Sequence, residues 1–170
     1  MGRGLRPDWF VQSLFTLTPQ EFAAQGVRGL LLDIDNTLVP NHVPDADDAV
    51  IGFVSRMQAA GIRMAIVSNA SEHRKERFNR PLGLPVVPRA FKPFRACFLE
   101  GLSLLDLPPD AVVMVGDQLF TDVIGANAAG IRSLLLEPMH RAEPWYVRLK
   151  RLLERIMLGG RVPSVHLDPP

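Results

Sequence analysis

Short apolar runs alternate with amphipathic segments along most of this chain. The apolar runs predict strands over residues 29–33, 62–68, 86–87, 112–115 and 133–136. The segments between them predict helices over residues 18–24, 45–60, 71–79, 93–105 and 121–129. Strands that alternate with helices are typical of an α/β fold, in which right-handed crossovers join parallel strands. The pattern therefore predicts a parallel sheet of about five strands with helices on both faces.

Three of the predicted strands end in polar side chains. In chain order, these side chains are Asp33 and Asp35, Ser68 and Asn69, and Asp117 followed by Asp122. Open α/β sheets bind their ligands at the carboxyl ends of the strands. Asp33 and Asp35 are two residues apart, so on an extended chain both would point to one side and reach one cation or one phosphoryl group. The alternative is that these carboxylates only end a strand and cap the next turn.

The order of these motifs resembles the haloacid dehalogenase-like (HAD) superfamily of phosphatases. The matching motifs are Asp-x-Asp-x-Thr at 33–37, Ser68 after the next strand, Lys92, and Gly-Asp-x-x-x-x-Asp at 116–122. The resemblance implies a Rossmann-like domain, and the short spacings leave no room for a substantial cap domain. Asp35 argues against dehalogenation, because the dehalogenases of this superfamily lack that second aspartate.

A narrower resemblance covers most of the chain. Its motifs are similar to those of YqeG-like phosphatases, capless type IIIA proteins related to mitochondrial phosphatidylglycerophosphate phosphatase. These motifs lie at residues 7–15, 33–39, 67–69, 92–93 and 116–122. One departure is Gly-Ala-Asn-Ala-Ala at 125–129, where the family pattern is Gly-Gly-Asn-Arg. The missing arginine leaves the four catalytic motifs intact.

The residue types in these motifs suit phosphomonoester hydrolysis. Attack by Asp33 on phosphorus would give an aspartyl-phosphate and divide the reaction into two easier steps. Asp35 is expected to protonate the leaving oxygen and then to activate water. Lys92 would supply a fixed positive charge to the transferring phosphoryl group.

Carboxylate ligands also predict a Mg²⁺ site, because this hard cation is usually bound by one or two carboxylates together with substrate phosphate and water. Asp33 and Asp117 are the expected carboxylate pair. The family resemblance adds the backbone carbonyl of Asp35, with Asp122 binding through water or orienting Lys92.

The expected partner is a phosphomonoester whose oxygens bind Ser68 and the backbone amides near Asn36 and Asn69. A site without a cap is open, which suits a large or surface-bound substrate, or an oligomer whose neighbouring subunit covers the cleft. The sequence favours hydrolysis of phosphatidylglycerophosphate. A soluble sugar- or nucleotide-phosphate phosphatase and a non-catalytic binding or regulatory module on the same fold remain alternatives.

Composition and charge narrow the setting. A chain of 170 residues suits one domain over 1–170, and its net charge of +1 argues against a nucleic-acid binder. The single Cys97 suits a reducing compartment, and we find neither a signal peptide nor an apolar run that would span a bilayer. The sequence therefore predicts a cytoplasmic protein.

Two segments also predict peripheral contact with the inner face of a membrane. Residues 141–161 form a basic amphipathic pattern with six basic and two acidic residues, a net charge of +4. A second apolar contact is predicted near the N-terminus at Trp9, Phe10, Leu14 and Phe15. The alternative is that both segments pack on the core or on a subunit interface.

Overall fold

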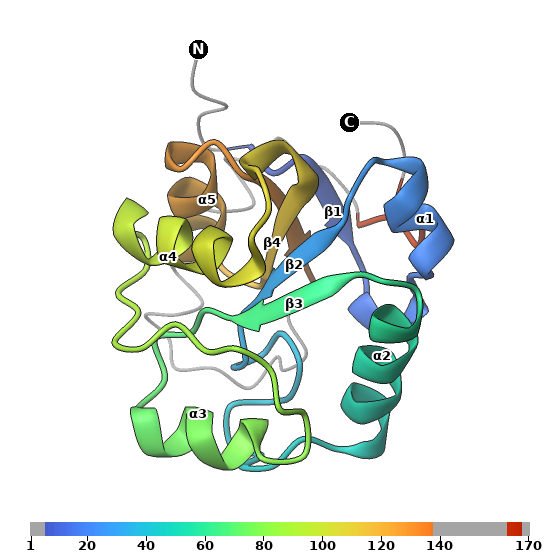
Figure 1. The fold of residues 1–170 in the computed structure, drawn as a ribbon. Coiled ribbons are helices and arrows are strands. Elements are labelled where there is room, and N and C mark those ends of the chain that lie inside the picture. Colours follow the sequence, from blue (N-terminus) through green and yellow to red (C-terminus); the bar gives the residue numbers. More distant parts are fainter. Residues whose placement is uncertain (1–5, 138–162, 168–170) are drawn as a thin grey trace.

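Five parallel strands form one sheet, in the order β1-β5-β4-β2-β3 (Figure 1). The strands are β1 (Trp9–Val11), β2 (Gly29–Leu32), β3 (Arg63–Ile66), β4 (Val112–Gly116) and β5 (Arg132–Leu136). This computed structural model describes residues 6–137 and 163–167. The predicted parallel α/β sheet is confirmed. Its fifth strand, however, is β1. The expected strand at 86–87 is only a single bridge between Val86 and Ile66.

Helices cover both faces of the sheet. They are α1 (Pro19–Ala24), α2 (Asp48–Ala59), α3 (Glu72–Asn79), α4 (Arg95–Leu105) and α5 (Ile124–Ala128). Two 3₁₀ turns, η1 (Leu14–Thr16) and η2 (Pro109–Ala111), and one π-helical turn, η3 (Leu119–Val123), complete the elements of the described residues. The even-numbered side chains of β2, such as Leu30 and Leu32, share one core cluster with α1 and α2. Leu31 points to the other face and packs with α4 and α5. Burial on both faces explains the continuous apolar run of this strand.

Local capping sets where the helices begin. Thr18 and Glu21 form the expected capping box at the start of α1. Helix α2 begins three residues later than predicted because Asp47 accepts the Val50 amide at 2.9 Å. Asp45 instead pairs with Arg77 of α3, with 2.7 Å between Asp45 Oδ2 and Arg77 Nη2.

The N-terminal apolar segment belongs to the core. Trp9, Val11 and Leu14 are buried, and β1 pairs with β5 through Trp9 opposite Leu134. Phe10 and Phe15 are half-buried and pack against apolar clusters. The predicted membrane contact through Trp9, Phe10, Leu14 and Phe15 is therefore wrong. A three-residue strand carries too short a pattern to be recognised in the sequence.

The described residues form no evident cap domain, as the short spacings predicted. In the part that the structure describes, β2 and β3 are joined through α2 alone, and β3 and β4 through α3, α4 and η2. The predicted basic helix at 141–161 lies outside the described residues. Within residues 6–137 and 163–167, no helix has the length and apolarity needed to cross a bilayer.

Close packing between α4 and α5 gives a test of this fold. An added Cβ at Gly125 would overlap the Phe98 ring and lie 3.0 Å from the Pro93 carbonyl oxygen. Gly125→Ala should therefore lower the free energy of unfolding by about 1–3 kcal/mol, measured by urea denaturation. Gly52→Ala in α2 is the matched control, because its nearest neighbour would be Arg56 Nη1 at 3.7 Å. Equal stability of the two variants would contradict this packing.

Candidate active site

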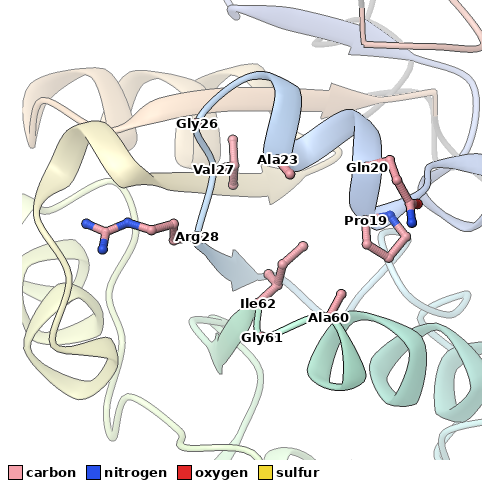
Figure 2. Close-up of a pocket in the computed structure, with 9 residues that line it drawn as sticks. All are labelled: Pro19, Gln20, Ala23, Gly26, Val27, Arg28, Ala60, Gly61 and Ile62. Carbon is pink, nitrogen blue, oxygen red and sulfur yellow. The ribbon is translucent and has the colours of Figure 1, made fainter.

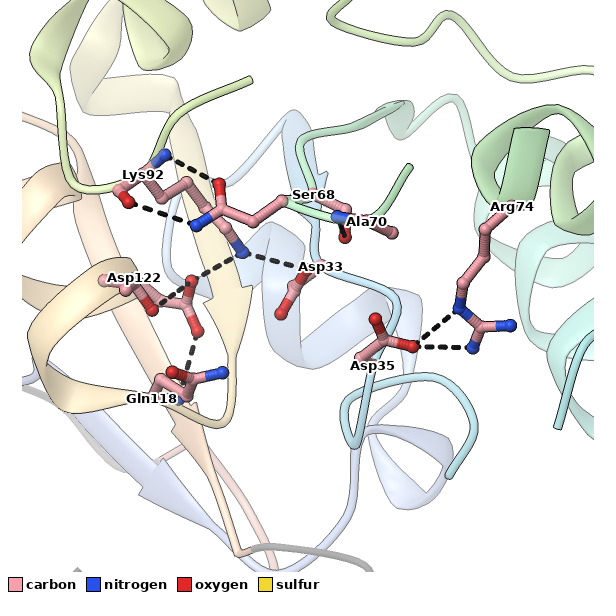
Figure 3. A network of polar contacts seen from close by, with 10 residues as sticks. Asp33, Asp35, Ser68, Ala70, Arg74, Lys92, Gln118 and Asp122 are labelled. Atoms are coloured by element: carbon pink, nitrogen blue, oxygen red, sulfur yellow. Dashed lines mark hydrogen bonds and ion pairs between the residues drawn. The ribbon is translucent and has the colours of Figure 1, made fainter. Parts of the chain in front are cut away.

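The carboxyl edge of the sheet brings four predicted residues together. Asp33 follows β2 and Asp117 follows β4, its neighbour in the sheet. Lys92 comes from the loop before α4, and Asp122 from the η3 turn, as Figure 3 shows for the Lys92 network. Each of these four side chains is buried. Neighbouring strand ends and two loops therefore assemble one enclosed polar cluster.

Lys92 binds two of the carboxylates directly. Its Nζ atom lies 2.8 Å from Asp33 Oδ1 and 2.7 Å from Asp122 Oδ1. Burial disfavours the charged ammonium, but the negative charges of Asp122 and Asp33 outweigh this and raise the pKa of Lys92 above its ordinary value. Lys92 is therefore positively charged across the physiological pH range.

A third carboxylate, that of Asp117, lies beside the two that bind Lys92. One oxygen each from Asp33, Asp117 and Asp122 lies within 4.8 Å of the others. Burial raises the pKa of Asp122; the Lys92 charge opposes this rise, and the Asp33 charge adds to it. Three carboxyl groups and one ammonium thus lie together in a buried cluster. Hard oxygen donors grouped in this way suit a divalent cation.

A glycine makes room for one of these carboxylates. A Cβ at Gly116, the last residue of β4, would overlap the Asp122 carboxylate. Asp122 Oδ2 also accepts the Gln118 amide at 3.0 Å. The glycine of the Gly-Asp motif is thus needed because the Asp122 side chain crosses the end of the strand at this point.

Asn69 is exposed, and its side chain also binds the backbone of Lys92. Its Oδ1 accepts the Lys92 amide at 2.7 Å, and its Nδ2 donates to the Lys92 carbonyl at 3.1 Å. Ser68 is buried after β3, and its Oγ accepts the Ala70 amide at 3.3 Å. The expected phosphate contacts of Ser68 and of the amides near Asn69 stay predictions. The clamp on Lys92 is a positioning contact that the sequence analysis missed.

Asn36 is occupied within its own loop. Its φ of 58° is left-handed, a conformation that asparagine tolerates better than most residues. Its amide donates to the Val39 carbonyl at 2.8 Å, and its Oδ1 accepts the Asn41 amide at 3.3 Å. The amide of Asn36 itself is therefore committed to the loop, and the expected phosphate contact of the amides near it stays a prediction.

Asp35 turns away from the carboxylate cluster and toward α3 (Figure 3). Its Oδ1 accepts Arg74 Nε at 2.8 Å and Arg74 Nη2 at 2.6 Å, while Arg74 Nη1 donates to the Val43 carbonyl at 3.0 Å. Because β2 ends at Leu32, the alternation that would point both carboxylates to one side no longer applies. Asp35 therefore lies outside the group of three carboxylates, and its convergence with Asp33 on one phosphoryl group stays a prediction.

A separate groove of about 650 Å³ lies at the opposite edge of the sheet (Figure 2). It is lined by α1, by Gly26–Arg28 before β2, and by residues 60–62 before β3. These segments precede the strands, whereas Asp33 and Asp117 follow them. The groove is therefore not part of the polar cluster.

The fold and the cluster together define a hydrolytic enzyme of the α/β class. The chain belongs to the haloacid dehalogenase-like hydrolases, whose family model matches residues 42–130. It is 35% identical over 162 residues to a probable phosphatase, YqeG, of Bacillus subtilis, covering 95% of this chain and 94% of that protein. The enzyme is a HAD phosphatase, as the motifs predicted.

Two further comparisons concern a plant relative and the fold. The chain is 27% identical over 162 residues to phosphatidylglycerophosphate phosphatase 1 of Arabidopsis thaliana, covering 89% of this chain and 47% of that protein. The chain thus spans about half the length of this plant relative. The crystal structure of an uncharacterised Listeria monocytogenes protein shares the fold, with a TM-score of 0.53 and 21% sequence identity. The match covers 79% of this chain and 100% of the Listeria chain.

The charge balance of the cluster predicts the effect of Lys92→Met. Removing the ammonium leaves buried carboxylates uncompensated, so we expect the free energy of unfolding in chelator to fall by about 3 kcal/mol. Added Mg²⁺ should recover part of this loss, because the cation would neutralise the same carboxylates. Urea denaturation with and without Mg²⁺ measures both effects.

Lys75→Met is the matched control for metal recovery. Lys75 is also buried but pairs with Glu72 of α3, at 2.6 Å between Lys75 Nζ and Glu72 Oε1. Its variant should not be stabilised by Mg²⁺ more than the wild type is. Equal recovery of both variants would contradict the idea that Lys92 and a metal balance the same charges.

Proposed function

We propose that this enzyme is a Mg²⁺-dependent phosphomonoester hydrolase that works through a phosphorylated Asp33 and acts on phosphatidylglycerophosphate. The observation that carries the proposal is the buried cluster of Asp33, Asp117, Asp122 and Lys92 at the carboxyl edge of the sheet. This cluster brings together a nucleophile, oxygen ligands and a cationic group. The whole chain, residues 1–170, is proposed as one phosphatase domain.

The proposed metal ligands are Asp33 and Asp117, with the backbone carbonyl of Asp35 and with Asp122 directly or through water. Bound Mg²⁺ would lower the repulsion between the carboxylate nucleophile and the anionic phosphate. Lys92 contributes a second positive charge beside Asp33 Oδ1. Ser68 and the amides after β3 are assigned to the phosphate oxygens.

In the first proposed step, Asp33 Oδ2 attacks phosphorus while Oδ1 stays bound to Lys92. An O–P bond forms to Asp33, and the P–O bond to the leaving alcohol breaks. The leaving oxygen takes its proton from the carboxyl group of Asp35. The products are the free alcohol and an aspartyl-phosphate.

In the second step, water attacks the same phosphorus. Its proton passes to the Asp35 carboxylate, and the bond between Asp33 and phosphorus breaks. Inorganic phosphate leaves, and both aspartates return to their starting protonation states. The two steps need no oxidant or reductant, since only O–P bonds and protons change.

Two observations support a lipid substrate. The described residues contain no cap domain, which leaves the carboxyl edge open to a headgroup held at a surface. The plant relative is named a phosphatidylglycerophosphate phosphatase. A small soluble ester would gain less from such an open edge, because small-molecule sites usually enclose most of their ligand.

A panel of phosphomonoesters tests this function. Phosphatidylglycerophosphate dispersed in detergent, a sugar phosphate, a nucleotide and a chromogenic aryl phosphate are assayed with Mg²⁺ and with chelator. We expect the lipid to have the highest kcat/KM, and chelator to abolish turnover of every substrate.

Asp33→Asn should remove activity, leaving about a thousandth or less, because the amide is a poor nucleophile. Full activity in chelator, or of Asp33→Asn, would overturn the mechanism, and a preference for the sugar phosphate or nucleotide would overturn the lipid assignment.

Arg74 is proposed as a positioning residue for Asp35. Arg74→Ala should lower kcat by about 10- to 100-fold with little change in KM, because a misplaced acid–base group slows chemistry more than binding. Arg74→Lys should restore part of kcat, since it keeps the charge without the two-pronged contact. Steady-state kinetics measures this split.

Arg77→Ala is the matched control on the same helix. Arg77 pairs with Asp45, which lies outside the cluster, so its loss should leave kcat unchanged. Equal losses of kcat in both variants would indicate that α3 has only a structural role. An increase in KM alone for Arg74→Ala would mean that Arg74 binds substrate rather than positioning Asp35.

A further inference from the structure

The loop that carries Lys92 also presents two phenylalanines to solvent. Phe91 is 67% exposed and Phe94 is 71% exposed, whereas Ala90 and Lys92 are buried. The loop therefore has an inner side, where Lys92 reaches Asp33, and an outer side formed by the two rings. The large apolar side chains stand one residue before and two residues after the lysine of the site.

Hydrogen bonds fix this loop in place. The Phe94 amide donates to the Phe91 carbonyl at 2.8 Å, and Asn69 holds the Lys92 backbone from both sides. The Arg89 amide donates to Glu72 Oε1 of α3 at 3.0 Å. Both ends of the loop are thus tied to neighbouring elements. The exposed rings are held on a rigid support beside the site.

The charge of this loop has one sign. Residues 88–99 contain Arg89, Lys92 and Arg95 and no aspartate or glutamate. Arg89 and Arg95 are exposed next to the two rings. Aromatic side chains flanked by arginines are the combination that suits the headgroup region of an anionic bilayer. We call Arg89, Phe91, Phe94 and Arg95 the loop surface.

We propose that the loop surface docks on an anionic phospholipid bilayer, with the two rings in the headgroup region and the two arginines on lipid phosphates. This inference deepens the proposed function and rests on it, because a lipid substrate is what docking would deliver. A protein partner is less well matched, since a stable protein interface needs about 20–30 residues on each side. The loop surface offers two large apolar side chains, which suffice for a peripheral contact that charge assists.

Docking here would place the membrane directly over the catalytic edge. Lys92 lies between the two rings in sequence and contacts Asp33 on the inner side of the same loop. A headgroup phosphate held at the bilayer surface would therefore meet the open edge of the sheet. The proposal thus assigns membrane contact to residues 89–95 in place of the N-terminal segment, which packs on the core. The predicted contact through residues 141–161 stays a prediction.

Vesicle co-sedimentation of the full chain tests the proposal. The vesicles are phosphatidylcholine alone or an equal mixture with phosphatidylglycerol. We expect the wild type to bind the mixed vesicles at low salt and to dissociate as salt rises. Phe91→Ser with Phe94→Ser should weaken binding about 10-fold or more. Arg89→Gln with Arg95→Gln should remove the preference for the anionic vesicles.

Matched controls come from the opposite end of the molecule. Leu104, near the end of α4, is 42% exposed, and Arg28 is exposed just before β2. Leu104→Ser and Arg28→Gln should bind vesicles like the wild type. Residues 141–161 are present in every variant, so a loss confined to the loop variants assigns binding to the loop surface.

Three results would overturn the docking proposal. The wild type does not bind the mixed vesicles, the loop variants bind like the wild type, or the control variants lose as much binding as the loop variants do. A phenylalanine variant that changes from dimer to monomer in sedimentation velocity, with vesicle binding intact, would assign the surface to a second copy of this chain instead.

Activity assays separate this proposal from the proposed function. The phenylalanine variant should hydrolyse the soluble aryl phosphate and the detergent-dispersed lipid at wild-type rates, and the lipid in vesicles more slowly. Vesicle binding that maps to the loop, without hydrolysis of the dispersed lipid, would support docking and overturn the function. Hydrolysis of the dispersed lipid without vesicle binding would support the proposed function and overturn docking.

Discussion

The contact between Lys92 and two buried aspartates is the interaction on which this site depends. Three carboxylates within 4.8 Å of one another would repel strongly in a buried position without a counter-charge. Much of the surrounding structure serves to keep the ammonium there. Asn69 holds the lysine backbone, and Gly116 leaves room for the carboxylate of Asp122. The oxygen atoms of three aspartates make the same cluster a candidate site for a divalent cation.

The loop before α4 links this buried chemistry to the outside of the molecule. A single turn, closed by the hydrogen bond from the Phe94 amide to the Phe91 carbonyl, points Lys92 inward and leaves two phenylalanines exposed. A change in its course would therefore move both. Packing of α4 on α5 supports the base of this segment, because Gly125 lies against Phe98 and the Pro93 carbonyl. The fold thus couples core packing, the cationic group and the exposed rings through a few residues.

The sequence could predict those parts of this arrangement that depend on local patterns. Apolar runs located four of the five strands, and the motifs identified Asp33, Lys92, Asp117 and Asp122, which meet at one sheet edge. The Arg74–Asp35 pair joins residues 39 positions apart, and the Asn69–Lys92 clamp joins residues 23 apart. Neither follows from periodicity or spacing. Strand β1 was missed because a three-residue strand is defined by its partner, not by its own pattern.

Trapping the covalent intermediate tests the central claim, that Asp33 carries the phosphoryl group. Enzyme turning over phosphatidylglycerophosphate with Mg²⁺ is quenched in acid, treated with borohydride to reduce the acyl phosphate, and digested for peptide mass spectrometry. The account predicts reduction at Asp33 in the presence of substrate and none in its absence. A phosphoryl group on another residue would contradict this account. So would an unmodified Asp33 in an enzyme whose burst of product shows that an intermediate accumulates.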